Sequence, residues 1–388
     1  METPRISAAT SILEATRALE PLITSAADAI EAERRLPSAV VEAMQKAGVF
    51  RMAVPREHGG PELDPLTQIR VVEELSRMDG SVGWCTMIGA SVGYIRAFMD
   101  PAVAQRLFST CDAVAAGQVV PRGRADVVDD GYRISGRWSF ASGCQHSEVL
   151  MAACQLCERG EPRRLADGQP ETRIMLVPVS KCTIIDTWDT TGLRGTGSHD
   201  YAIDDVFVPA TDTFSFFDPP WYPRPLYALP QMFLANHAGI PLGIARAAID
   251  TVVELSAHRI MSPAQRLMRE DGQVQEAIAW AEASLGAARS YVFSIMEEIW
   301  DTLCRGESLS FRQRGLYRIM LVYVHRVAKD MVELMYDTAS THAIFRKHPL
   351  DRQMRDILTA CQHRVLQSNV CRPGGRMLLG LEPNAPFF

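Results

Sequence analysis

A run of short β-type segments between Asp112 and residue 212 constrains the fold of this chain more than any other feature. The segments are rich in β-branched and aromatic residues, and Gly, Pro or Asp turns separate them: DAVAAGQVV, DVVDDGYRISGRWSF, SEVLMAACQL, TRIMLVPVS, CTIIDTWDT and YAIDDVFVP. Asp130-Gly131 predicts a hairpin turn, and the polar stretch 158–170 predicts an exposed hairpin loop. Many short strands without intervening helices predict a β-barrel or sandwich of roughly a hundred residues.

Helical patterns flank this β-domain on both sides. Before it, apolar residues recur at helical spacing in several stretches, one of them predicted to run from Ser81 to Met99. After Pro230, four long amphipathic segments predict an up-down bundle; Pro241 suits the first turn of its first helix, and its last helix is predicted to continue past His363. The predicted fold class is therefore α+β, with these parts: an N-terminal helical domain (1–112), a central β-domain (113–212), an aromatic and proline-rich connector (213–230) and a C-terminal four-helix bundle (231–388).

Charge and composition exclude several classes of protein. The chain has 388 residues with 40 Lys+Arg against 46 Asp+Glu, and no basic run or basic-aromatic stripe, which argues against nucleic-acid binding. No apolar stretch has the length of a membrane span, and the N-terminus lacks the apolar block of a signal peptide. The nine cysteines are scattered and odd in number, as in reduced proteins of the cytosol. A cytoplasmic enzyme is the expectation.

One Cys-x-x-Cys sequence, Cys154 to Cys157, lies within a predicted strand. Residues three apart on a strand point to opposite faces, so the two thiols cannot share a metal ion while the chain is extended. No second pair completes a zinc site. We therefore predict two core residues and no metal site.

The stretch GRWSFASGCQH, residues 136–146, combines aromatic rings, hydroxyls, a thiol and an imidazole. Strand alternation predicts that Trp138, Phe140 and Ser142 share one face, and Gly143 allows a turn or a close backbone approach. Such a face suits a planar heteroaromatic ligand such as a flavin ring. The alternative is an aromatic edge strand followed by a plain loop.

At the level of the whole chain, the sequence resembles the acyl-CoA dehydrogenase superfamily. The domain order carries the resemblance, together with VPREHGG (54–60), WSFASGCQH (138–146), WDTTGLRGTGSHDYAIDDVFVP (188–209), Arg259 and the pair Arg355-Asp356. It implies an acyl-CoA dehydrogenase-like fold with a flavin. Neither a Gly-x-Gly-x-x-Gly sequence nor a P-loop is present, so side chains must hold the cofactor.

The catalytic carboxylate of the dehydrogenases is missing from both of its usual places. One place, eight residues after Asp356, holds Arg364, and the other, ten residues before Gly243, holds Phe233. An arginine cannot act as a base at neutral pH. His363 stands beside the first place, and this pattern is similar to the two-component flavin-dependent monooxygenases (group D hydroxylases) built on the same fold.

The resemblance to these monooxygenases implies a role for each candidate residue. His363 would deprotonate the substrate or polarise the oxygen, and Ser142 would hydrogen-bond near flavin N5. The other implied contacts are these: Trp138 and Phe140 against the flavin ring, Gly143, Ser198 and Gln118 on the cofactor, Arg259 on its phosphate, and His146 and Trp84 on the substrate side. Structural roles remain the alternatives: a helix histidine for His363, a loop hydrogen bond for Ser142, a helix C-terminal cation for Arg259 and a core residue for Trp84. Ser340 and Thr341 replace a Gly-Gly pair that related enzymes often place near a neighbour's flavin phosphates.

The implied activity is that of a reduced-flavin-dependent monooxygenase. It would take FMNH₂ or FADH₂ from a separate NAD(P)H:flavin reductase, use O₂, and hydroxylate a small aromatic, polyketide-like or steroid-derived substrate through a flavin C4a-hydroperoxide. A homotetramer is the implied assembly. Two alternatives stay open: an acyl-CoA dehydrogenase or oxidase with a displaced base, and a non-enzymatic binding or assembly subunit.

Overall fold

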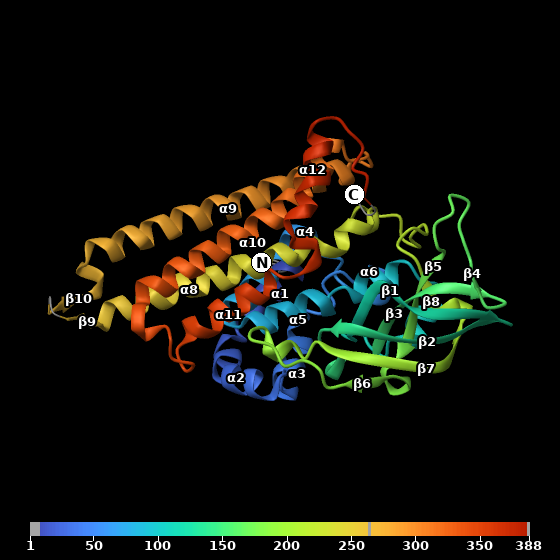
Figure 1. Cartoon of the computed structure of the whole chain (residues 1–388), viewed down its shortest axis with the longest axis horizontal. Helices are drawn as coiled ribbons and strands as arrows, with labels where there is room; N and C mark the ends of the chain where they lie inside the picture. The colour runs from blue at the N-terminus through green and yellow to red at the C-terminus, as the bar shows by residue number, and fades with distance from the viewer. Residues whose placement is uncertain (1–7, 263–264, 386–388) are drawn as a thin grey trace, which may run out of the picture. The chain divides into compact units, whose positions relative to one another are not determined.

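The structure is a computed structural model that describes residues 8–262 and 265–385. These residues form two compact units, each assembled from separate parts of the chain (Figure 1). The first unit contains the chain up to Asp64, residues 85–189 and residues 194–233. The second contains residues 65–84, residues 190–193 and the chain from Leu234 onward. The sequence-based boundaries at residues 112, 212 and 230 stay a prediction.

Short helices begin the first unit, as the apolar spacing predicted. They are α1 (Ala8–Arg17), α2 (Glu20–Glu33), α3 (Ser38–Ala47), α6 (Val92–Ala97) and α7 (Pro101–Leu107). Gly48 ends α3 with φ +80°, and the Asp100 carboxylate caps α7 by accepting the N–H groups of Ala102 and Val103. The single helix predicted over residues 81–99 is wrong, because the chain there forms α5 (Gly80–Gly89) and then α6.

The β-domain is one mixed sheet, which confirms the predicted α+β class. The strands are β1 (Ala115–Val128), β2 (Gly131–Ala141), β3 (Val149–Glu158), β4 (Glu161–Pro162), β5 (Thr172–Pro178), β6 (Thr183–Ile185), β7 (His199–Pro209) and β8 (Thr213–Phe214). Their order is β6-β7-β2-β1-β3-β5-β8, and β4 pairs with β3. The β1–β3 pair is parallel and the other pairs are antiparallel. Among the described strands β6 and β8, at the two ends of this order, do not pair with each other.

Both turn predictions for the sheet are confirmed. β1 and β2 form a hairpin in which Val128 pairs with Gly131, and Asp130 has φ +60°. The two loop residues are therefore Asp129 and Asp130, one position earlier than the Asp-Gly pair indicated. Residues 158–170 form an exposed hairpin that carries β4.

Aromatic and sulfur-containing side chains fill the core of the sheet. Trp138 stacks on Tyr201 with ring centroids 5.3 Å apart, and its indole N–H donates to the carbonyl of Ala153. Cys154 and Cys157 are both buried in β3, which confirms that they are core residues. Burial raises the pKa of the Cys154 thiol to about 12, so this thiol is not reactive.

The connector after the sheet is only partly buried. Phe214, Phe216 and Tyr227 are buried, and the Tyr227 hydroxyl donates to the carbonyl of Ala53. Phe217 and Trp221 are exposed. They flank the prolines of this segment, which fix the backbone direction without requiring every ring to pack inward.

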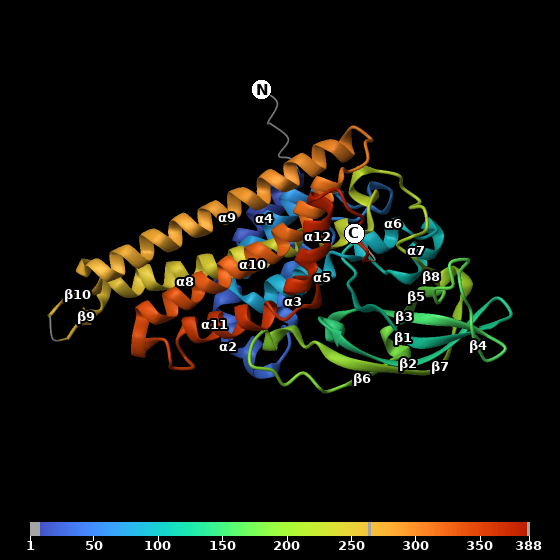
Figure 2. The same cartoon turned by 45° about the horizontal axis from the view of Figure 1, so that its top comes forward.

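Helices form most of the second unit, and α9 and α10 are the longest among the described residues. The helices are α4 (Pro65–Met78), α8 (Gly239–His258), α9 (Gly272–Cys304), α10 (Phe311–Ala339), α11 (Pro349–Ala360) and α12 (Cys371–Leu378), with a small hairpin of β9 (Ile260–Met261) and β10 (Arg266–Leu267). In Figures 1 and 2, α8, α9 and α10 lie side by side. Asp271 caps α9 and Ser310 forms a capping box at the start of α10. No helix among the described residues is long and apolar enough to cross a membrane.

The prediction that the last long helix continues past His363 is wrong. α11 ends at Ala360, and His363 lies in the turn that follows, with extended backbone angles (φ −59°, ψ 135°). The apolar spacing was misleading because Leu366, beyond this turn, is also buried. His363 is therefore a turn residue rather than a helix residue.

Candidate functional site

The 136–146 stretch does not have the regular alternation that its sequence indicated. The pairing of β2 with β7 shifts between Trp138 and Ala141, and Phe140 within this bulge has φ +65°. Trp138 has no exposed surface, whereas 64% of the surface of Phe140 is exposed. The prediction that Trp138, Phe140 and Ser142 share one face is therefore wrong. The contact of Trp138 with a flavin ring stays a prediction. Bulges often re-aim a side chain beside an active site, and here the bulge turns Phe140 outward.

Phe140 carries the conformational cost of this arrangement. A non-glycine residue with positive φ costs about 1–3 kcal/mol, and phenylalanine has no polar atom to offset it. The Phe140 ring meets the edge of Trp188 at a centroid distance of 6.1 Å. An exposed aromatic ring held in a strained backbone marks this part of the first unit as a candidate ligand surface.

A chain of hydroxyl groups lies just after the bulge. The Ser142 and Ser198 Oγ atoms are 2.6 Å apart, and Ser198 Oγ is also 2.6 Å from Thr196 Oγ1. All three residues are buried. Gly143 turns the chain with φ +77°, and its N–H donates to the carbonyl of Thr196. The structure thus brings together Ser142, Gly143 and Ser198, three of the predicted cofactor residues.

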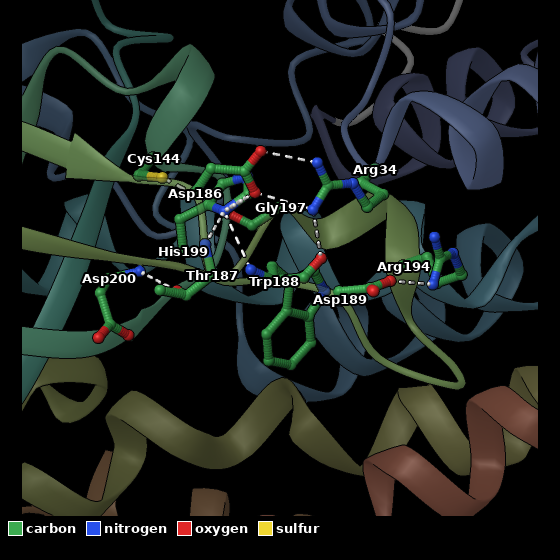
Figure 3. A network of polar contacts seen from close by, with 10 residues as sticks. All are labelled: Arg34, Cys144, Asp186, Thr187, Trp188, Asp189, Arg194, Gly197, His199 and Asp200. Carbon is green, nitrogen blue, oxygen red and sulfur yellow. Dashed lines mark hydrogen bonds and ion pairs between the residues drawn. The ribbon is translucent and has the colours of Figure 1, made fainter.

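A polar network holds the strand and loop that carry Ser198 (Figure 3). The Arg34 guanidinium donates two hydrogen bonds to the Asp186 carboxylate and one to the Trp188 carbonyl. The N–H groups of Thr187 and Trp188 both point to His199 Nδ1, each at 3.2 Å. Because this nitrogen accepts, the ring is a neutral structural residue, and burial lowers its pKa. His199 is the first residue of β7.

Gln118 and His146 lie at the edges of this arrangement. The Gln118 amide oxygen accepts from the N–H groups of Val119 and Val120, where the pairing of β1 with β3 is irregular. His146 ends a short 3-10 helix, and its ring lies 6.2 Å from that of Phe50. Burial lowers the pKa of His146 to about 4, so the ring is neutral at physiological pH. The structure gives Gln118 a structural task and leaves the cofactor role a prediction.

His363 belongs to a buried ring cluster in the second unit. Its ring centroid lies 5.7 Å from that of Trp84 and 5.2 Å from that of His237. His237 in turn contacts Trp84 at 5.2 Å and His325 at 5.0 Å. Neither His237 nor His325 was predicted from the sequence. His325 carried a usable signal, because it is a polar residue on the apolar, buried face of α10, beside Val322 and Val324.

Arg259 caps the C-terminus of α8 and reaches the end of another helix. Its guanidinium donates to the carbonyl of Ala339, the last residue of α10, at 2.8 Å. The next residue, Ser340, has φ +53° and ψ −134°, a conformation that normally requires glycine. Ser340 and Thr341 thus replace the Gly-Gly pair in sequence, while Ser340 keeps a backbone conformation that favours glycine.

No carboxylate replaces the missing dehydrogenase base at either of its two usual positions. Phe233 is packed among Tyr94 and Phe216, with ring centroids 6.1 and 5.1 Å away. Arg364 is exposed in the turn after α11. Asp356 is buried, and its Oδ1 accepts the N–H of Leu193 at 2.6 Å, so this carboxyl has a structural partner.

The residues of the first unit fit a flavin. A buried hydroxyl chain offers donors and acceptors to the polar edge of an isoalloxazine ring, and the outward Phe140 offers an apolar surface. Gly143 and Gly197 are both in positive-φ conformations, and a Cβ atom on Gly197 would lie 2.5 Å from Gln145 Oε1. Groups of His, Cys, Asp and Glu that could hold a metal ion are not found among the described residues.

Two models of one protein family match this chain. Residues 12–111 match "Acyl-CoA dehydrogenase, N-terminal domain" and residues 235–368 match "Acyl-CoA dehydrogenase, C-terminal domain". The chain belongs to the acyl-CoA dehydrogenase superfamily. Its resemblance to the flavin-dependent monooxygenase branch is also confirmed, because the proteins that it matches over most of their length include flavin-dependent monooxygenases.

Two curated relatives and one solved structure illustrate this similarity. Indole-3-acetate monooxygenase of Pseudomonas putida is 29% identical over 353 residues, which cover 90% of this chain and 89% of that protein. The oxygenase component of FADH₂-dependent resorcinol hydroxylase from Rhizobium is 28% identical and covers 94% of this chain and 93% of its own. The crystal structure of the HsaA monooxygenase from M. tuberculosis superposes with a TM-score of 0.89 at 25% identity, covering 98% of this chain and all of the other.

Proposed function

We propose that this protein is the oxygenase component of a two-component system and that it hydroxylates a small aromatic substrate with reduced flavin and O₂. The proposal depends on one observation: His363 stands beside the position where the dehydrogenases carry their catalytic carboxylate and this chain carries Arg364. His363 lies in a buried ring cluster with Trp84 and His237, while Arg364 and Phe233 hold the positions of the dehydrogenase carboxylate. The named relatives, an indole-3-acetate monooxygenase and a resorcinol hydroxylase, support an aromatic substrate.

The chain's own residues divide the work. Reduced flavin supplies, when bound, the electrons that activate O₂. Ser142 and Ser198 would hydrogen-bond the polar edge of the flavin ring, and Phe140 would pack against its apolar surface. Arg259 would bind the flavin phosphate. His363 would accept the proton of a substrate hydroxyl or N–H group; burial lowers its pKa to about 4, so the ring is neutral and able to accept at neutral pH.

Several finer points belong to the same proposal. A separate NAD(P)H:flavin reductase would supply the reduced flavin, as the words "oxygenase component" in a relative's name imply for that relative. FMN and FAD are both compatible with the contacts above. We also propose that the protein forms a homotetramer in the cytoplasm. His146 and Trp84 would lie on the substrate side of the flavin.

The first test reconstitutes the full chain with a flavin reductase, NADH and ¹⁸O₂, using indole-3-acetate, resorcinol and a panel of substituted phenols as probes. The expected product carries one ¹⁸O atom and forms only when reductase and flavin are both present. Bleaching of bound oxidised flavin by an acyl-CoA without reductase would instead identify a dehydrogenase and contradict the proposal.

The second test assigns Ser142 and His363. Ser142→Ala should raise the ratio of released H₂O₂ to hydroxylated product, because it removes one end of the hydroxyl chain. Ser147→Ala is the matched control, because the Ser147 hydroxyl donates to the Gly143 carbonyl in the same loop. This variant removes a hydrogen bond from the loop but leaves the hydroxyl chain of Ser142, Ser198 and Thr196 intact. His363→Ala should reduce product formation about 100-fold, the usual size of an acid-base contribution, with flavin affinity nearly unchanged. Normal hydroxylation by both variants would show that these assignments are wrong.

A further inference from the structure

Three histidine rings contact one another in series inside the second unit. His363, in the turn after α11, contacts His237 at a centroid distance of 5.2 Å, and His237 contacts His325 of α10 at 5.0 Å. His237 belongs to the 3-10 helix Pro230–Ala238, so three separate segments each contribute one ring. Histidine is mostly a surface or half-buried residue, so three adjoining rings, of which His237 and His325 are fully buried, require a physical explanation.

The explanation lies in the ring nitrogens. Four of the six are buried without a hydrogen-bond partner among the described residues: His363 Nδ1, His237 Nδ1, His237 Nε2 and His325 Nε2. Leaving a buried polar atom without a partner is costly, so native structures usually pair such atoms. Two N–H···N hydrogen bonds, one on each side of His237, would satisfy all four atoms.

The ring separations match such bonds. Two imidazoles joined by an N–H···N bond have centroids roughly 5 Å apart, which is the hydrogen-bond length plus the distance from each nitrogen to its ring centre. The observed 5.0 and 5.2 Å agree with this value. The torsion that orients an imidazole is soft, so rotation of the rings can align the nitrogens.

His325 sets the direction in which the three histidines donate and accept hydrogen bonds. Its Nδ1 lies 2.8 Å from the carbonyl oxygen of Leu321, and since a carbonyl only accepts, Nδ1 must carry the proton. In a neutral ring, His325 Nε2 is then an acceptor. His237 must therefore donate to His325 with one nitrogen and accept from His363 with the other.

We propose that His237 and His325 are positioning residues that hold His363 in its Nδ1–H tautomer and leave His363 Nε2 as an unprotonated acceptor. His363 is half-buried, and Nε2 is not among its buried unpartnered atoms. The catalytic meaning of this tautomer rests on the proposed function, because a proton-accepting His363 needs a bare nitrogen. The tautomer itself does not depend on that function.

The surroundings keep all three rings neutral, and the N–H···N hydrogen bonds require neutral rings. Burial lowers the pKa of His363 to about 4 and of His325 to about 3, and burial with the two neighbouring rings lowers that of His237 well below its usual range. His325 also lines a cavity of about 260 Å³ whose charged lining residues are the cations Arg326 and Lys329. Cys361 lines the same cavity, and burial raises the pKa of its thiol to about 11, so it adds no charge.

The direct test is ¹⁵N solid-state NMR of the full-length protein labelled at histidine, at neutral pH. The His363 signals are assigned by comparison with His363→Gln. Wild-type His363 should show a protonated Nδ1 and a bare Nε2. His237→Phe keeps an aromatic ring against Trp84 but removes the acceptor, so His363 should lose this preference. His237→Gln, which can donate and accept, should restore it.

Kinetics add a readout that a merely structural role would not move. His237→Phe should lower kcat about 10-fold or more while the KM for substrate and the Kd for reduced flavin change less than about twofold. His237→Gln should recover most of this loss. His258→Gln, at the exposed end of α8, is the matched control and should match wild type.

Two results would overturn the proposal. One is a wild-type His363 with its proton on Nε2, and the other is an unchanged His363 tautomer in His237→Phe. Failure of the proposed function looks different: the wild-type protein would form no hydroxylated product, or His363→Ala would hydroxylate normally, while the NMR tautomers stayed as expected.

Discussion

Asp356 is a buried carboxyl group that should remain protonated in the folded protein at neutral pH. It lies on α11 and is only 4% exposed. Burial raises its pKa, and so does the nearby Asp79, whose carboxylate is held in place by the N–H groups of Ser81 and Val82. Asp356→Asn is the perturbation that tests this, because the amide copies the shape of the neutral acid and keeps an oxygen for the Leu193 N–H.

The sign of the effect follows from proton uptake. In the unfolded chain this carboxyl has its ordinary pKa of 3.8 and is ionised at higher pH, whereas the folded protein keeps the proton. Folding thus binds one proton, and the free energy of unfolding falls by about 1.4 kcal/mol per pH unit as pH rises above the unfolded pKa. The loss stops where the folded carboxyl ionises. Asn cannot titrate, so the variant should gain on the wild type by roughly 3 kcal/mol between pH 5 and 7.

Urea unfolding of both proteins at pH 5, 6 and 7 measures this difference. Asp351→Asn is the matched control on the same helix: Asp351 pairs with Arg355 at 2.7 Å, and its removal should not produce a gain of this sign. Infrared difference spectra of wild type minus Asp356→Asn should show the carbonyl band of a protonated carboxylic acid at pH 7. Parallel stability curves for wild type and variant, or the absence of that band, would refute the reasoning.

Three further substitutions have defined outcomes. Ser340→Gly should raise the free energy of unfolding by about 1 kcal/mol in urea titrations, because glycine relieves the φ +53° conformation. Trp138→Phe should lower the free energy of unfolding by about 2–3 kcal/mol, since it removes the hydrogen bond to the Ala153 carbonyl and leaves a void. The flavin affinity measured by calorimetry should change less than about twofold. A large loss of affinity would show that Trp138 belongs to the cofactor site. Gly143→Ala should cost about 1–2 kcal/mol and weaken flavin binding, because its Cβ would lie 2.9 Å from His146 Nε2 at φ +77°; an unchanged affinity would separate this turn from the cofactor.

Much of the architecture was predictable because it depends on apolar spacing and turn residues. The strands of the β-domain, the helices before and after it and the hairpin at Asp130 all follow from local chemistry. The neighbouring hydroxyls of Ser142 and Ser198 came from the resemblance rather than from any local rule, since these two residues lie on different segments.

The failures share a physical cause, which is that tertiary packing overrides local pattern. Strand alternation cannot detect a bulge formed by a phenylalanine with positive φ, so Trp138 was given the wrong face. Helical spacing cannot detect a turn when the residue beyond it, Leu366, is also buried. His237 escaped notice because its importance lies in its neighbours, and they come from elsewhere in the chain.

The order β2-β1-β3 gives residues 142–148 a second task. The chain leaves β2 at Ala141 and must cross the start of β1 before Val149 can pair with Ala115. The loop that carries Ser142 and Gly143 is therefore also the crossover that sets the register of β3. A deletion that this short crossover could not absorb would pull a central strand out of register, and a one-residue slip turns the side chains of a strand to the opposite face. In this protein a change of specificity through this loop has to come from replacing side chains, because the loop length is tied to the sheet.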